Sequence, residues 1–322
     1  MSGAGLRAVA EDEADIRLDR WLRRHFPGLT QGVIQRLCRT GQIRVDGHRV
    51  AASARLAPGQ SVRIPKLPDA PAAAPARAPA APDSTAREAL ERMVLYRDDQ
   101  VIVLNKPPGL PTQGGPGIQR HLDGMLAAFG DPRPRLVHRL DRDTSGVLVV
   151  ARTQGVAARL AAAFRTRAVA KTYWAVVLGR PVPVAGRIDM ALLRHDPGPG
   201  GARVAPAAAD EPDSVRAITD YRTLDHAGRK LAWLELLPQT GRTHQLRVHC
   251  AAIGAPILGD DAYGALPMEG LSPLLHLHAR RLELPHPAGG VLAVEAPLPP
   301  HIAATFRALG FTAAPPCPPR RT

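Results

Sequence analysis

A stretch rich in alanine and proline, residues 67–90, interrupts the chain and limits how the rest can fold. Repeated prolines remove backbone donors and fix φ, so this stretch is predicted to be an extended, semi-rigid linker. The chain of 322 residues is therefore expected to fold as two units, a small one over residues 1–66 and a large one over residues 91–312. Residues 313–322 are rich in proline and end in two arginines before the last threonine, which predicts a flexible basic tail.

The composition narrows the class of protein. A formal net charge of +13 indicates a polyanionic partner, either a nucleic acid or an anionic membrane surface. No apolar run reaches the roughly 18 residues of a membrane-spanning helix, and the N-terminus lacks the apolar core of a signal peptide. Cys38, Cys250 and Cys317 are scattered without CxxC spacing, which argues against a disulfide framework and a cysteine-rich zinc site. These features predict a soluble cytoplasmic protein.

The small unit has the pattern of a compact basic domain. Residues 16–26 carry apolar side chains at helical spacing, and residues 31–39 predict a second helix. An Asp-Gly hairpin signal lies within residues 43–50, and residues 59–65 form a last alternating strand. Between residues 17 and 66 there are eleven Lys or Arg and two Asp or Glu, an electrostatic footprint for phosphates. This order of motifs resembles the S4 RNA-binding domain.

The large unit is predicted to be α+β with a mixed, mostly antiparallel sheet. Apolar, β-branched runs predict strands at residues 101–104, 147–151, 172–178, 217–224, 231–236 and 291–295. Helical periodicity is found at residues 155–165, 244–253 and 301–309. Strands dominate and do not alternate regularly with helices, which favours an antiparallel sheet over a parallel one. Residues 195–212, rich in Gly, Pro and Ala, are predicted to be a long surface loop.

A charged turn leads directly into the strand predicted at residues 147–151. Five ionisable residues lie in this turn: His138, Arg139, Asp141, Arg142 and Asp143. Charged side chains on a loop anchored by a core strand are a common arrangement for catalytic groups. The structural alternative is a solvated bend that Asp143 or Ser145 shapes.

Two further segments carry candidate residues. Lys106 precedes a Pro-Pro-Gly turn, where it could contact a phosphate or simply lie at the surface. Tyr173 alternates with Ala175 and Val177, so it is expected to face the same apolar side of its strand.

A third segment, residues 239–249, combines a strand end with the start of a helix. Thr243 is a plausible N-cap, and Arg242 could bind a phosphate near that helix N-terminus. Arg247 lies among Leu246 and Val248, so it is expected to be largely buried and to need a carboxylate partner.

Taken together and in this order, the segments resemble the RluA-type family of RNA pseudouridine synthases. His-Arg-Leu-Asp-x-Asp-Thr-Ser-Gly at residues 138–146 matches the active-site signature of that family, and the resemblance extends from residue 93 to residue 300. It is closest to the RluC and RluD enzymes of large-subunit ribosomal RNA. Gln113 stands where those enzymes have a histidine in a His-Gly-Gly-x-Gly stretch.

The resemblance implies catalytic roles for three residues. Asp141 would be the catalytic aspartate, Tyr173 would stack on the target base, and Arg247 would pair with Asp141. Arg139 would enter the RNA and help to fill the gap left by the extruded base.

The resemblance also implies a substrate-binding surface. Leu246, with Leu277 or Leu282 from the last family motif, would form the apolar wall of the pocket, and Lys106 and Arg242 would contact the substrate.

The reaction implied by the family is an isomerisation, so no redox step and no cofactor are required. The expected partner is large-subunit ribosomal RNA or its precursor particles, acted on by a monomer in the cytoplasm. The non-enzymatic alternative is an RNA-binding or ribosome-assembly factor, for which the S4-like unit and the basic charge would suffice.

Two other chemistries are weaker alternatives. Asp141-Arg142-Asp143-Thr144 imitates part of the Asp-x-Asp-x-Thr nucleophile of haloacid-dehalogenase phosphohydrolases, and Asp260-Asp261 imitates their magnesium-binding acids. Those enzymes need the aspartates after a parallel strand, whereas here the strand follows.

A metal site could use His276, His278 and His286, or His244 and His249. No carboxylate or cysteine spacing reinforces these histidines, so ordinary structural roles are favoured.

Overall fold

The structure of the chain is a computed structural model that describes residues 5–26, 28–65, 84–115, 117–198, 201–264, 268–314 and 320–321. The chain divides into two compact units, Met1–Ala81 and Pro82–Thr322. Most of the predicted linker lies outside the described residues, but its last part does not. Ser84–Glu91 forms helix α3, which buries Ala86 and Leu90 in the core of the large unit. The prediction that the linker reaches residue 90 is therefore wrong. Ala86 and Leu90 lie one turn apart on one face of the helix, so both side chains can pack into the same core.

The small unit packs two helices against a sheet that has three strands among the described residues, in the order β1-β3-β2. Its elements are β1 (Gly5–Ala8), the 3-10 helix η1 (Glu11–Glu13), α1 (Leu18–His25), α2 (Gln31–Arg39), β2 (Arg44–Val45) and β3 (Ser61–Ile64). Trp21 and Ile34 are fully buried between the helices and the sheet. After the Asp-Gly turn, the predicted return strand is reduced to a single Val45–His48 bridge, and β3 pairs with β2 instead.

The large unit is built mainly from strands. Its strands are β4 (Val94–Arg97), β5 (Val101–Lys106), β6 (Arg135–Leu136), β7 (Ser145–Ala151), β8 (Ala170–Leu178), β9 (Ala185–Gly198), β10 (Gly201–Ala207), β11 (Val215–Ala227), β12 (Leu231–Pro238), β13 (Leu277–Pro285), β14 (Val291–Glu295) and β15 (Arg320–Arg321). Its other helices are α4 (Leu122–Met125), the 3-10 helix η2 (Leu126–Phe129), α5 (Gln154–Arg165), α6 (Gln245–Ala252) and α7 (Pro300–Leu309). None of the helices in the described part of the chain is long and apolar enough to cross a membrane.

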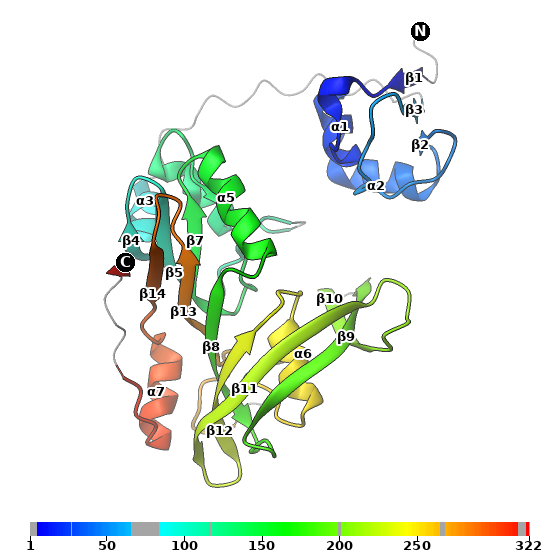
Figure 1. The fold of residues 1–322 in the computed structure, drawn as a ribbon. Coiled ribbons are helices and arrows are strands. Elements are labelled where there is room, and N and C mark those ends of the chain that lie inside the picture. Colours follow the sequence, from blue (N-terminus) through cyan, green and yellow to red (C-terminus); the bar gives the residue numbers. More distant parts are fainter. Residues whose placement is uncertain are drawn as a thin grey trace. The chain divides into compact units, whose positions relative to one another are not determined.

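A central sheet with the strand order β10-β9-β11-β12-β8-β13-β7-β5-β4 runs through the unit (Figure 1). β13 and β7 pair in parallel, and the other described neighbours are antiparallel. Helix α5 packs Val156 and Leu160 against β7 and the β13–β14 pair. The predicted class, α+β with a mixed and mostly antiparallel sheet, is confirmed.

In the segment predicted as a long loop, residues 195–212, the described residues 195–198 and 201–207 belong to two paired strands. β9 and β10 pair with each other, with Val204 opposite Arg194. Val204 is buried with Leu192 and Val248, which supplies the apolar contact that the Gly- and Pro-rich composition conceals. Pro206 is tolerated because β10 is the edge strand of the central sheet, where a missing backbone donor leaves no neighbour unpaired.

The predicted flexible tail is ordered at one point among the described residues. The backbone of Arg320 and Arg321 pairs with Ala293 and Leu292 of β14. Residues 315–319 and 322 lie outside the described part of the chain, so the prediction is wrong for the two arginines and stays untested for those six.

Candidate active site

Seven of the eight predicted site residues line one cavity of the large unit. They are brought together from the 138–144 loop, β8, the 239–247 segment and β13: Arg139, Asp141, Tyr173, Arg242, Leu246, Arg247 and Leu277. These segments lie far apart in the sequence, and the sheet order β8-β13-β7 places three of them side by side. Leu282, the alternative to Leu277, lies instead in the core cluster beneath α5.

The backbone on both sides of Asp141 is held in place by buried side chains. The Thr112 hydroxyl donates to the Leu140 carbonyl at 2.6 Å and accepts from the Leu140 amide at 3.3 Å. On the other side, Lys106 Nζ donates to the Arg142 carbonyl at 2.8 Å. The backbone on both sides of Asp141 is therefore held in place, and Asp141 lines the cavity.

Lys106 is the predicted substrate-binding residue that the structure places elsewhere. Its side chain is fully buried, and Nζ also donates to the carbonyls of Pro107 and Leu110, each at 2.9 Å. Burial lowers the pKa of Lys106 to about 7, while Asp143 and Asp141 oppose that shift. The lysine was expected at the surface because it precedes a Pro-Pro-Gly turn, but that turn folds back over it and leaves no donor for a phosphate.

We expect Lys106→Met to lower the free energy of unfolding by about 3 kcal/mol, because three backbone carbonyls lose the donor that this fully buried lysine supplies. Chemical denaturation followed by circular dichroism would measure the change. Lys230→Met, at an exposed lysine, is the matched control and should stay within about 0.5 kcal/mol of the parent. Equal effects of the two substitutions would contradict a clamping role for Lys106.

Tyr173 lies on β8 with its ring packed among the apolar residues Ala175, Val177 and Leu277, on the side that the strand alternation predicted. Burial, with a further contribution from the Asp141 carboxylate, raises the pKa of the Tyr173 phenol well above its usual value. The phenol is therefore protonated at neutral pH, and its apolar ring faces the same cavity as Asp141.

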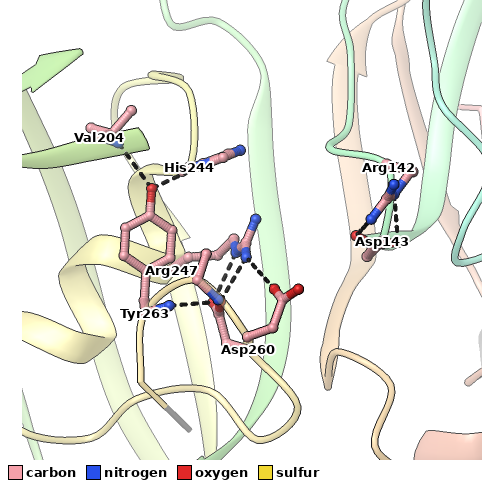
Figure 2. A network of polar contacts seen from close by, with 9 residues as sticks. Arg142, Asp143, Val204, His244, Arg247, Asp260 and Tyr263 are labelled. Carbon is pink, nitrogen blue, oxygen red and sulfur yellow. Dashed lines mark hydrogen bonds and ion pairs between the residues drawn. The ribbon is translucent and has the colours of Figure 1, made fainter. Parts of the chain in front are cut away.

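Arg247 has a different carboxylate partner from the one expected. Its Nε and Nη2 donate to the two oxygens of Asp260 at 2.8 and 2.6 Å, and both side chains are buried (Figure 2). Burial disfavours the charged guanidinium, but the bonds to Asp260 and the attraction of Asp141 outweigh it, so the pKa of Arg247 is raised. The predicted pairing with Asp141 is therefore corrected. Asp141 acts on Arg247 through its charge, and Asp260 supplies the hydrogen bonds.

Tyr263 completes the surroundings of Arg247 (Figure 2). Its ring lies 5.0 Å from the guanidinium carbon, and its hydroxyl accepts from the Val204 amide of β10 at 3.1 Å. Asp260 also accepts from the Tyr263 amide. Tyr263 was not predicted from the sequence, and Asp260 was predicted only as an imitation of a magnesium ligand. The one signal in the sequence for a carboxylate beside Arg247 was the rule that a buried arginine needs such a partner.

Helix α6 begins differently from the expected Thr243 N-cap. The capping position is His244, with φ of 53°, and its side chain does not cap the helix. The buried Gln245 side chain instead accepts from the Arg242 amide at 3.0 Å and from the Thr240 hydroxyl at 2.7 Å. Its amide nitrogen donates to the Ile218 carbonyl at 3.0 Å. Gln245 thus ties the start of α6 to the ends of β11 and β12, and it positions Arg247 one helical half-turn further on.

The two remaining cations among the predicted site residues, Arg139 and Arg242, are accessible. Arg139 is exposed and its Nη1 lies 3.4 Å from Gln113 Oε1, so the residue that replaces the family histidine contacts the arginine expected to enter the RNA. Arg242 is also exposed, with Nε donating to the Arg216 carbonyl. Both are positioned to approach a nucleic acid.

Three of the histidines considered as metal ligands, His244, His276 and His278, have hydrogen-bond partners, whereas both ring nitrogens of the buried His249 have none in the described part of the chain. His276 lies 2.7 Å from the Leu274 carbonyl and 2.8 Å from the Thr305 hydroxyl, and His278 lies 2.9 Å from the Ser145 hydroxyl. In the described part of the chain, no three His, Cys, Asp or Glu side chains are grouped as a metal ion would require.

Two buried histidines and the half-buried His138 should make the large unit sensitive to acid. Burial lowers the pKa of His138 to about 3, of His276 to about 4 and of His278 to about 3. Because these values lie below the unfolded value of 6.5, the unfolded chain binds more protons below that pH, and stability present above pH 6.5 is lost as the pH falls. Each such histidine should contribute a slope of up to about 1.4 kcal/mol per pH unit.

Urea denaturation between pH 7.5 and pH 5 would measure this slope. His138→Gln keeps an acceptor for the Val149 amide, which His138 Nε2 now binds at 2.9 Å, and should make the slope shallower by about one proton. His226→Gln, at an exposed histidine, should leave the slope unchanged. A slope that is the same in all three proteins would contradict the prediction.

Both units of the chain are similar to known protein families. Residues 100–252 match the RNA pseudouridylate synthase family, and residues 16–62 match the S4 domain. The chain is 35% identical over 288 residues to ribosomal large subunit pseudouridine synthase C of Rickettsia bellii, covering 88% of this chain and 94% of that protein. It is 33% identical to the Vibrio cholerae protein of the same name, covering 91% and 93%. The structure of human RNA pseudouridylate synthase domain containing 4 aligns with a TM-score of 0.58 and 30% identity, over 70% of this chain and 96% of that one.

Fold, cavity and matches together define an RNA-modifying enzyme unit joined to an S4 domain. The chain belongs to the family of RNA pseudouridine synthases, enzymes that isomerise uridine to pseudouridine in RNA.

Proposed function

We propose that this synthase acts on large-subunit ribosomal RNA and that Asp141 is its catalytic aspartate. The relatives named for the large ribosomal subunit match nearly their whole length, which supports this substrate. The observation that carries the catalytic assignment is the cavity in which Asp141 faces Tyr173 and the buried, fixed Arg247. We further propose that the enzyme is a monomer of the cytoplasm that acts on ribosomal RNA or its precursor particles.

The proposed reaction breaks the bond between N1 of uracil and C1′ of the ribose, turns the base, and joins C5 to C1′. N1 gains a proton and C5 loses one, so atoms balance without an oxidant or a cofactor. A carboxylate reaches the nucleoside only after the base leaves its stack, at a cost of a few kcal/mol that pocket contacts recover. The Tyr173 ring offers a stacking face, and Leu246 and Leu277 exclude water around it.

The Asp141 carboxylate lines the same cavity as the guanidinium of Arg247, whose positive charge attracts it. Three uses of this carboxylate would serve the reaction: addition to C6 of uracil, attack on C1′, and removal of the 2′ proton. Arg139 is exposed at the rim, where it is placed to fill the gap that the extruded base leaves in the RNA.

The test is tritium release from a transcript of large-subunit ribosomal RNA labelled at C5 of uridine. Because C5 loses its hydrogen in this reaction, release that depends on the protein demonstrates turnover, and mapping of the product locates the uridines. A transcript of small-subunit ribosomal RNA is the matched control and should release little. Equal release from both transcripts would remove the proposed substrate preference while leaving the synthase activity in place.

Tyr173→Phe separates the two uses of the tyrosine. The substitution keeps the stacking ring but removes a hydroxyl that could move a proton at C5, so we expect similar RNA affinity and a turnover lower by about 10²-fold. Single-turnover tritium release alongside equilibrium binding would measure both quantities. Unchanged turnover would restrict Tyr173 to stacking.

A further inference from the structure

A second hollow, which we call the lateral groove, joins the catalytic cavity on the side of α5. It runs past the end of α5 and the start of β8 to the end of β12, three elements that Figure 1 labels in the large unit. Arg139, Lys171, Tyr173 and Arg242 line both the groove and the catalytic cavity. A polymer whose one unit occupies the cavity would therefore have the groove as a continuation.

All the charged side chains that line the groove are positive, which the net positive charge of the protein does not by itself explain. Its charged lining consists of Arg139, Arg165, Arg167, Lys171 and Arg242, and none of the described residues that line it carries a carboxylate. A separate hollow near α3 serves as a comparison. There, three arginines are balanced by Glu91, Asp99 and Asp131. Uncompensated positive charge is thus a property of the lateral groove and matches a phosphodiester backbone.

Arg165 and Arg167 provide two cations of the groove that are available for a ligand. Both residues are exposed, and neither guanidinium makes an ion pair or a hydrogen bond within the part of the chain that the structure describes. Arg167 is close enough to Lys171 that its charge, after burial, helps to lower the pKa of that lysine. Two cations that repel one another in this way favour an anion between them.

Arg167 also adopts a backbone conformation that its side chain makes unfavourable. Helix α5 ends with the Ala168 amide bonded to the Ala163 carbonyl at 3.1 Å, and Arg167, with φ of 61°, occupies the left-handed position of that motif. Glycine is the residue favoured there, since a Cβ disfavours positive φ. An arginine at this position therefore carries a backbone cost that glycine would avoid. Arg165 differs, because a cation in the last helical turn is favourable for the helix itself.

We infer that the lateral groove binds the backbone of the RNA strand next to the target uridine, with Arg167 and Arg165 contacting its phosphates. The inference rests on the proposed function, because the strand is that of the uridine substrate. Aromatic groups lie along the same path, with His138 stacked on Phe164 at 4.5 Å beside the groove and Tyr173 at its junction with the cavity. When the target nucleotide leaves the RNA stack and binds at Tyr173, the next nucleotide of the strand would lie within reach of the two arginines.

Arg167→Gly tests the inference, because it removes the cation and places the favoured residue at the helix end. Affinity for the large-subunit ribosomal RNA transcript is measured by equilibrium binding of the full chain at several KCl concentrations. We expect an unchanged or higher melting temperature, about tenfold weaker binding, and a salt dependence shallower by about 0.7 for each phosphate that the variant no longer neutralises. Arg165→Gln combined with Arg167→Gly should reduce the slope by about twice that amount. Turnover at saturating RNA should stay close to that of the parent.

Arg229→Gln is the matched control. Arg229 is exposed between β11 and β12, roughly 23 Å from the groove by the rise of β12, and its replacement should leave affinity and salt slope unchanged. Parental affinity and slope in the double variant would overturn the groove assignment, as would a lower melting temperature in Arg167→Gly that accounts for weaker binding. Binding is measured without turnover, so a parent that releases no tritium would overturn the proposed function, whereas the groove assignment would still be decided by the binding data.

Discussion

Asp141→Asn is expected to abolish tritium release, with turnover lower by at least about 10⁴-fold, while RNA affinity stays within a few-fold of the parent. An amide has nearly the size and shape of the carboxylate, so the Thr112 and Lys106 contacts to the neighbouring backbone should hold the loop in place. The amide cannot act as a nucleophile or a base, and a loss of this size is typical when the reacting group itself is removed. Single-turnover tritium release and equilibrium binding on the same RNA would measure the two effects.

Asp143→Asn provides the matched control from the same loop. Asp143 is partly exposed and pairs with Arg142, whose guanidinium is itself exposed, so the pair is worth little. Its substitution should preserve most of the turnover. Full turnover in Asp141→Asn would remove this residue from the chemistry, and full biological function without turnover would favour the RNA-binding or ribosome-assembly alternative.

Gly146→Ala is expected to destabilise the large unit by at least about 3 kcal/mol. Gly146 has φ of 110°, and a Cβ at this position would lie 2.2 Å from the Ala279 carbonyl oxygen and 2.8 Å from the Ala279 backbone carbon and nitrogen. The contact is with backbone of β13 rather than with a movable side chain, so strands β7 and β13 would have to separate where they pair in parallel. Strain at positive φ and steric overlap add to one another.

Chemical denaturation and the melting temperature would measure this effect, with Gly155→Ala as the control. Gly155 lies in α5 with nothing within 4 Å of an added Cβ, so alanine there should be neutral or stabilise by up to about 1 kcal/mol. Because Gly146 lies just beyond the Asp141 loop, we also expect lower turnover in whatever Gly146→Ala protein folds. A melting temperature equal to that of the parent would show that the strands accommodate the methyl group.

Local patterns predicted much of the fold, and the exceptions have identifiable causes. Strand β14 and helix α2 begin and end at the predicted residues, because their apolar side chains repeat with the period of the element. The β9–β10 hairpin was missed because its glycines and prolines are typical of loops, and its pairing partner is supplied by β11. Helix α3 was missed because its short sequence follows directly on an Ala/Pro-rich stretch.

The candidate site shows the same division. The sequence motifs identified seven residues that the fold gathers around one cavity, since charged residues on loops and tyrosine on a half-buried strand are visible in a single chain. The partner of Arg247 and the burial of Lys106 were not visible. Each depends on which backbone or carboxylate comes close after folding, and Asp260 is separated from the arginine by a turn and the end of α6.

The sequence by itself therefore determined the two-unit organisation, the periodicity of most strands and helices, the positive charge, and the identity of the residues that can do chemistry. Only the tertiary structure decided which of those residues meet. Parallel pairing of β7 with β13 brings the Asp141 loop to Leu277. Lys106, which the sequence left as a candidate at the surface, is buried and donates to the Arg142 carbonyl. Local patterns report the intrinsic preferences of neighbouring residues, whereas contacts across a sheet depend on strand order, which no local window of sequence contains.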